Sequence, residues 1–114
     1  MSEEKLAEAV FERLAAQELH ELLEALVDCG EEVDPDLQSG VLTLEFEDGS
    51  QYVLNSHRAA RQIWMAAEQT AWHFDYQRST TRWIAVQTGV ELRAELSAAM
   101  SRKLGATVKL AVTV

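Results

Sequence analysis

Apolar residues recur with two different periods along the chain, and each period predicts a different kind of element. In the N-terminal third they recur at helical spacing, which predicts one long helix with a broad apolar face. That face consists of Phe11, Leu14, Leu19, Leu22, Leu23 and Leu26. Ser2 is a suitable cap for this helix, and Gly30 is a suitable left-handed cap at its end.

The middle of the chain alternates between apolar and polar residues, which is the period of a half-buried strand. The alternation predicts that Leu42, Leu44, Phe46, Tyr52, Leu54, Ile63 and Met65 point inward. Asp48-Gly49 is typical of a two-residue type I′ hairpin turn between the first two of these strands. The same alternation places Asn55, Gln62 and Trp64 on the opposite face of the sheet.

Further strands are predicted on both sides of this region. Residues 31–37 (EEVDPDL) form a short run whose Pro35 cannot donate a hydrogen bond, so this strand belongs at a sheet edge. Residues 72–76 (WHFDY) and 83–86 (WIAV) are two more strands, the last being a fifth or sixth.

A second helix is predicted near the C-terminus. Thr88 and Glu91 have the spacing of a capping box, after which the apolar residues return to helical spacing and stop at Gly105. Its buried residues are expected to be Leu92, Leu96, Met100 and Leu104. The tail, residues 107–114, either pairs as a final strand or packs between the helices.

Two amphipathic helices on either side of a run of hairpin-connected strands predict an α+β fold in a two-layer sandwich. We expect both helices to pack on one face of an antiparallel sheet of five to seven strands, within a single domain spanning residues 1–114. Antiparallel sheets can leave their other face to water.

Charge is distributed very unevenly along the chain. The net charge is −9, which argues against nucleic acid and anionic membrane surfaces as partners. Residues 1–36 hold twelve acidic residues and only two basic ones, whereas the remaining 78 residues hold seven acidic and eight basic residues. The acidity is therefore a property of the N-terminal third.

The sequence offers little catalytic machinery. The single cysteine, Cys29, excludes an internal disulfide and fits a reducing compartment. No apolar run approaches 18 residues, so we expect no membrane span and a cytoplasmic location. His20, His57 and His73 lack metal-ligand spacing, and we do not expect an enzyme.

The acidic residues allow two interpretations. Glu21, Glu24 and Asp28 form one stripe on the predicted helix, and further carboxylates follow at once in Glu31, Glu32, Asp34 and Asp36. They form either a solvated face that serves solubility or a surface for a cation or a basic partner. Carboxylates without histidine or cysteine suit hard ions, and exposed side chains on a helix predict weak, poorly selective binding.

Trp64 also allows two interpretations. Aromatic residues on strands usually belong to the core, and a shift of one residue in register would bury Trp64. That shift would expose Ile63 and Met65 together, which is a poorer solution. We therefore predict that Trp64 faces outward, where an aromatic residue beside Asn55 and Gln62 has the composition of an interface hot spot.

Several motifs taken together resemble the frataxin family, and specifically its bacterial members. They are Ser39-Gly40 with the following VLT, FEDGS in the hairpin, Asn55, QIW at residues 62–64, WHFDY, the later WI, and Thr88-Gly89. The resemblance runs without gaps from about Glu32 to Tyr76 and continues to about Leu110.

This resemblance implies an α-β-α sandwich that binds iron (Fe²⁺ or Fe³⁺) weakly, with no organic cofactor. It implies an acidic ridge as the iron site, consisting of Glu21, Glu24, Asp28, Glu31, Glu32, Asp34 and Asp36. It also implies a regulatory role in iron–sulfur cluster assembly, as iron donor or sensor. In that role Asn55, Gln62 and Trp64 would dock on the cysteine desulfurase and its scaffold protein.

Two other functions stay open beside this one: a metal-independent acidic adaptor that binds a basic protein surface, and a weak ferroxidase. We expect a monomer, with iron-induced oligomers as an alternative. The chain departs from the pattern of the family it resembles at Ala25 and Val27, which interrupt the acidic ridge, and this predicts a lower iron capacity.

Overall fold

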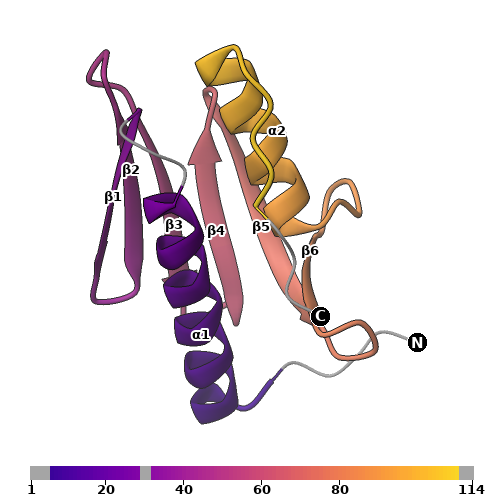
Figure 1. Ribbon diagram of the computed structural model, residues 1–114. Helices are drawn as coiled ribbons and strands as arrows, with labels where there is room; N and C mark the ends of the chain where they lie inside the picture. Colours follow the sequence, from indigo (N-terminus) through magenta and orange to yellow (C-terminus); the bar gives the residue numbers. More distant parts are fainter. Residues whose placement is uncertain (1–5, 29–31, 111–114) are drawn as a thin grey trace.

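A computed structural model describes residues 6–28 and 32–110 of the chain (Figure 1). The elements in chain order are helix α1 (Glu8–Val27), strands β1 (Val33–Gln38), β2 (Val41–Phe46), β3 (Gln51–His57), β4 (Gln62–Ala67), β5 (Thr70–Gln77) and β6 (Arg82–Ala85), and helix α2 (Leu92–Leu104). The six strands form one antiparallel sheet in which each strand pairs with the next along the chain.

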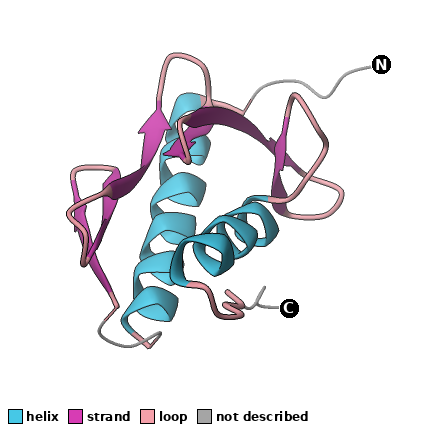
Figure 2. Cartoon of the chain, turned by 90° about the horizontal axis from the view of Figure 1, so that it is seen from above, coloured by secondary structure: helices cyan, strands magenta, loops and turns pink. Residues whose placement is uncertain are grey.

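Both helices lie on the same face of the sheet, and the sheet curves around them (Figures 1 and 2). The predicted α+β class and the placement of both helices are therefore confirmed, with six strands. Every described helix is too short or too polar to cross a membrane.

The core lies between the helices and the covered face of the sheet. All of the inward-facing residues predicted on β2, β3 and β4 are buried, as are Phe11, Leu19, Leu22 and Leu26 on α1. Helix α2 contributes Leu92, Leu96 and Met100. Burying one such side chain stabilises the fold by about 1.5–3 kcal/mol relative to leaving it in water.

Strand β1 is the outer strand at one edge of the sheet, as Pro35 predicted. Val33 is buried and Leu37 is partly buried on the helix side, whereas Asp34 and Asp36 project from the uncovered face. In the pairing with β2, Asp34 lies directly opposite Glu45.

Helix α1 begins later than predicted. Leu6 and Ala7 are not helical, and Ala7 occupies the cap position without a side-chain hydrogen bond. Leu6 is buried in the core instead, and its carbonyl accepts a hydrogen bond from Nε of Arg61 at 3.2 Å. The predicted caps Ser2 and Gly30 both lie outside the described residues.

The hairpin between β2 and β3 is not the predicted two-residue type I′ turn. Its loop has three residues, because the Phe46 N–H donates to the Ser50 carbonyl at 2.9 Å and the Gly49 N–H donates to the Phe46 carbonyl at 2.9 Å. A type I′ turn needs positive φ at both central residues, whereas only Gly49 has it here (φ 85°). Asp48 instead accepts hydrogen bonds from the backbone and hydroxyl of Ser50.

The predicted capping box of α2 is also wrong. Glu91 is itself the cap residue, and its carboxylate accepts hydrogen bonds from the N–H groups of Arg93 and Ala94. The reason is tertiary, because a backbone bridge between Ile84 and Glu91 holds Glu91 in extended conformation beside β6. The helix therefore begins at Leu92, three residues later than a box capped by Thr88 predicts.

The described part of the tail does not join the sheet. The N–H groups of Val108 and Leu110 donate to the hydroxyls of Ser101 and Ser97 on α2, at 2.8 and 2.9 Å. Leu110 is buried in the core, so the tail packs against the helical layer.

Candidate functional site

The uncovered face of the sheet carries the residues that the alternation placed there. Asn55 on β3 pairs with Trp64 on β4, and Trp64 pairs with His73 on β5, so these three side chains form one row across the sheet. All three are half-buried. Because both helices lie on the opposite face, this row faces away from the core (Figure 2).

Trp64 is held between two histidines. Its ring stacks on His57 with centroids 3.8 Å apart and planes 13° apart, and on His73 at 4.3 Å and 14°. The prediction of an outward Trp64 is confirmed, but both faces of the indole are covered. The edge of the ring is therefore what Trp64 presents outward.

Hydrogen bonds extend this stack. The indole Nε1–H of Trp64 donates to Oε1 of Gln62 at 2.8 Å, and Nε2 of Gln62 donates to Oδ1 of Asp75 at 3.0 Å. Nδ1 of His57 accepts a hydrogen bond from the Ala60 N–H at 3.3 Å. These contacts fix one orientation of Trp64 and make a rigid surface, which lowers the entropic cost of binding a partner.

The sequence interpretation missed the two histidines. A signal for them was present, because pairing β3 with β4 and β4 with β5 brings Trp64 opposite His73 and diagonal to His57. Reading each histidine for metal-ligand spacing alone overlooks this cross-strand relation.

The acidic ridge is spread over two elements. Glu24 is exposed on α1, and Asp28 is exposed at the cap that ends this helix. Asp34 and Asp36 are exposed on β1, Glu32 is exposed just before β1, and Glu31 lies outside the described residues. Glu24 contacts Nε2 of His20 at 3.4 Å. Within the described ranges, no three histidine, cysteine or acidic side chains gather closely enough to hold a metal ion. The donor chemistry fits a hard cation such as iron, held by few carboxylates at a time.

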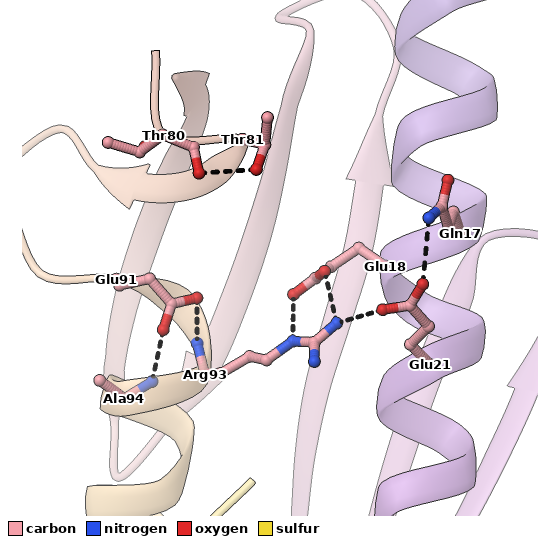
Figure 3. Close-up of polar contacts among 8 residues, drawn as sticks. All are labelled: Gln17, Glu18, Glu21, Thr80, Thr81, Glu91, Arg93 and Ala94. Carbon is pink, nitrogen blue, oxygen red and sulfur yellow. Dashed lines mark hydrogen bonds and ion pairs between the residues drawn. The ribbon is translucent and has the colours of Figure 1, made fainter. Parts of the chain in front are cut away.

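Glu21 differs from the rest of the ridge because it is bound to Arg93 at the start of α2 (Figure 3). Oε1 of Glu21 accepts a hydrogen bond from Arg93 at 2.8 Å, and Oε2 accepts one from Gln17 at 3.0 Å. The hydrogen bond from Arg93 is the main cause that holds the pKa of Glu21 below its ordinary value of 4.5, and the hydrogen bond from Gln17 is the second cause.

Glu18 completes this cluster. Its two carboxylate oxygens accept hydrogen bonds from Nε and Nη2 of Arg93, at 2.9 and 2.8 Å. The hydrogen bond to Glu18 is the main cause that raises the pKa of the Arg93 guanidinium. Neither Glu18 nor Arg93 was a candidate from the sequence, and no local pattern points to them, because 75 residues separate the two.

Comparisons with known proteins agree on one family. A family model described as "Frataxin-like domain" matches residues 4–106. The iron–sulfur cluster assembly protein CyaY of Thioalkalivibrio sulfidiphilus is 37% identical over 107 residues, covering 92% of this chain and 100% of that protein. The CyaY of Cupriavidus pinatubonensis is 35% identical over 109 residues, covering 92% and 96%.

Solved structures show the same likeness. A frataxin from Psychromonas ingrahamii matches with a TM-score of 0.86 and 30% identity, covering 94% of this chain and 100% of that one. A trimeric yeast frataxin complexed with ferrous iron matches with a TM-score of 0.70 and 25% identity, covering 91% of each chain.

Proposed function

Since the chain belongs to the frataxin family, we propose that it takes part in iron–sulfur cluster assembly as an iron-binding regulatory protein in the cytoplasm. It docks through the uncovered sheet face on the cysteine desulfurase and its scaffold protein, and it meets iron at the acidic ridge. The relatives from Thioalkalivibrio and Cupriavidus are iron–sulfur cluster assembly proteins, which supports this process for the chain. The ferrous complex of the yeast frataxin supports iron as the metal.

One observation carries the docking proposal: the ordered stack of His57, Trp64 and His73 on the face of the sheet opposite to α1 and α2. Interface hot spots are enriched in tryptophan and lie in rigid, well-packed surroundings. Gln62 and Asp75 hold the edge of this stack in place through hydrogen bonds. Such a surface can bind a partner with little reorganisation.

The part of the acidic ridge that belongs to β1 lies on the same face of the sheet as Trp64. Asp36 pairs with Thr43, which pairs with Val53, which pairs with Ala66, so their side chains all project from the uncovered side. Strand β1 is three strands away from β4, which is about 14 Å at the usual strand spacing. A basic partner that covers Trp64 would therefore meet these carboxylates and be steered by them.

The iron proposal rests on the open carboxylates of the ridge. The side chain of Glu24 is 68% exposed, and Asp28, Glu32, Asp34 and Asp36 are also exposed. Exposed carboxylates on a helix and an edge strand bind a hard cation weakly. We therefore propose iron as a cargo or signal that exchanges rapidly with solvent.

Docking is tested with Trp64→Arg in a pulldown with the desulfurase, at low and high salt and with and without Fe²⁺. We expect an intact fold and lost capture, because the substitution removes the stacked ring and adds a charge at the docking face. Ala94→Arg is the matched control, since it adds the same charge at an exposed position on α2. Equal capture by the Trp64→Arg variant and the wild type would contradict the docking face.

The same experiment separates the two other functions. Capture that is weakened by salt but does not depend on Fe²⁺ would favour the metal-independent adaptor, because exposed charges are screened over about 8–10 Å. Catalytic oxidation of Fe²⁺ that is lost on Glu21 and Glu24 replacement would favour the ferroxidase.

A further inference from the structure

We infer that Arg93 acts as a built-in counter-ion that excludes metal from one end of the acidic ridge. Its guanidinium group occupies the carboxylates of Glu18 and Glu21. Among the described ridge residues, iron is then confined to Glu24, Asp28, Glu32, Asp34 and Asp36. This inference rests on the proposed iron binding, and it assigns Arg93 as the residue that decides where on the ridge the metal binds.

Every carboxylate oxygen of the two glutamates already has a donor (Figure 3). Arg93 donates to both oxygens of Glu18 and to Oε1 of Glu21, and Gln17 donates to Oε2 of Glu21. Each oxygen keeps a second lone pair, but a metal ion bound there would lie close to the fixed positive charge of Arg93, which repels it. A metal ion that takes the place of Arg93 instead must displace hydrogen bonds of 2.8 to 3.0 Å.

Burial makes that displacement unfavourable. The side chain of Arg93 is 5% exposed and that of Glu18 is 12% exposed. A guanidinium group cannot lose its proton in a protein, so an Arg93 deprived of its partners would be a buried, uncompensated charge. A weakly binding, exchangeable cation cannot offset that cost.

Arg93 is also held in place from its own helix. Its backbone N–H donates to Glu91, the cap residue of α2, at 2.9 Å. Because both the backbone and the side chain are fixed, the guanidinium group lies against α1 in one defined position (Figure 3). Rotation of the Arg93 side chain into solvent would break its contacts with both Glu18 and Glu21.

The other end of the ridge offers no such competitor. The carboxylate of Glu24 is mostly exposed and contacts only the exposed His20 among the described residues. Asp34 forms no ion pair within residues 6–28 and 32–110, and Asp36 has a single long contact, with Gln38 at 3.5 Å. Of the two described ends of the ridge, this one presents oxygen atoms that a metal can reach away from the charge of Arg93.

The test measures the apparent affinity for Fe²⁺, without oxygen, by isothermal titration calorimetry of the full chain. Glu24→Gln should weaken binding roughly tenfold, as expected for the loss of one charge-assisted contact. Glu21→Gln should change the affinity for Fe²⁺ by less than about twofold, because only a small effect of the lost charge remains after screening by solvent and salt. Glu12→Gln is the matched control, because it also removes a carboxylate of α1 that pairs with an arginine, here Arg58 at 2.6 Å.

A gain of binding is expected when the counter-ion is removed. In Arg93→Met, which leaves Glu18 and Glu21 without their donor, Fe²⁺ should bind more tightly and broaden the amide signals of residues 17–21 in NMR spectra. In Arg93→Lys, which keeps the positive charge, this gain should be absent. Circular dichroism checks the fold of each variant, and the comparison of Glu21→Gln with Glu24→Gln decides the question if Arg93→Met does not fold.

The outcomes separate this inference from the proposed iron binding. Equal weakening by Glu21→Gln and Glu24→Gln would overturn the inference while leaving iron binding intact. Fe²⁺ binding in neither the wild type nor Arg93→Met would overturn both. Binding that appears only in Arg93→Met would support the role of Arg93 and contradict iron binding by the natural chain.

Discussion

The two ends of the acidic ridge contain the same functional group in opposite environments. On α1, Glu21 is bound by Arg93 and Gln17 and its side chain is 33% exposed. On β1, Asp34 is exposed and faces another carboxylate, that of Glu45, across the strand pair. The first end is compensated by a cation from a distant part of the chain, and the second end is left to repel its neighbour.

This difference shows that the net charge of a segment does not predict which of its carboxylates can bind a cation or a basic partner. Both ends lie in a stretch that has no basic residue between positions 21 and 36. One buried arginine from α2 neutralises part of that stretch. Asp34 and Asp36 have no ion pair with any described residue. Such carboxylates are destabilising for the strand pair and attractive for a cation or a basic surface.

Removing Arg93 should have the largest effect on the difference between the two ends of the acidic ridge. Arg93→Met should destabilise the fold by about 3 kcal/mol or more, because it leaves the partly buried carboxylates of Glu18 and Glu21 without a counter-charge. Urea unfolding followed by circular dichroism measures this as a lower transition midpoint. Arg82→Met is the control, since Arg82 forms no ion pair with the described residues, and it should change stability by no more than about 0.5 kcal/mol. A similar effect of both substitutions would show that the ion pair does not stabilise the fold.

A second test uses pH. Because the pKa of Glu21 is lowered in the folded protein, its ionised carboxylate contributes to the free energy of unfolding at pH values above 4.5. This contribution is lost as the pH falls through the lower pKa of the folded state. Wild type should exceed Glu21→Gln in stability by about 1 kcal/mol near neutral pH, a value reduced for the partial exposure of Glu21. The difference should vanish on acidification. In the Arg93→Met background the advantage of Glu21 over its Glu21→Gln replacement should be lost or reversed near neutral pH, because Glu21 is then a like charge beside Glu18 without the arginine. An advantage of undiminished size there would contradict the assignment.

The smallest effect is expected at the open end. Asp34→Asn should stabilise the protein by a few tenths of a kcal/mol, because it removes one of two like charges that face each other across β1 and β2. Asp36→Asn is matched to it but lies opposite Thr43, so it should give no such gain. In about 1 M salt the gain from Asp34→Asn should disappear, because screening then acts within about 3 Å. Equal gains from both substitutions would point to net charge as the cause.

Trp64 illustrates what a local pattern contains and what it lacks. Alternation places it on the same face as Gln62 and Asn55, because side chains of a strand alternate between two faces whatever the partner strands are. Its degree of exposure depends on His57 and His73, which come from the two neighbouring strands. The face was therefore predictable, whereas the stacking required the register of three strands.

The three local errors have a common origin. The β2–β3 loop, the start of α1 and the cap of α2 were each predicted from turn or cap residues alone. In the structure Asp48 binds Ser50, Leu6 enters the core, and Glu91 is held extended beside β6. Each of these contacts outweighs a local preference of about 1 kcal/mol.

By itself, the sequence determined the layers of this protein. The periods of 3.6 and 2 define which residues of each helix and strand are apolar, and burying those residues together leaves one arrangement in which both helices cover one face of the sheet. The tertiary structure alone decided which charges are neutralised. Arg93 lies 72 residues from Glu21 and 75 from Glu18, and a hydrogen bond across that separation exists only after the helices have packed. The part of the acidic ridge that remains open to a cation is consequently a property of the folded molecule.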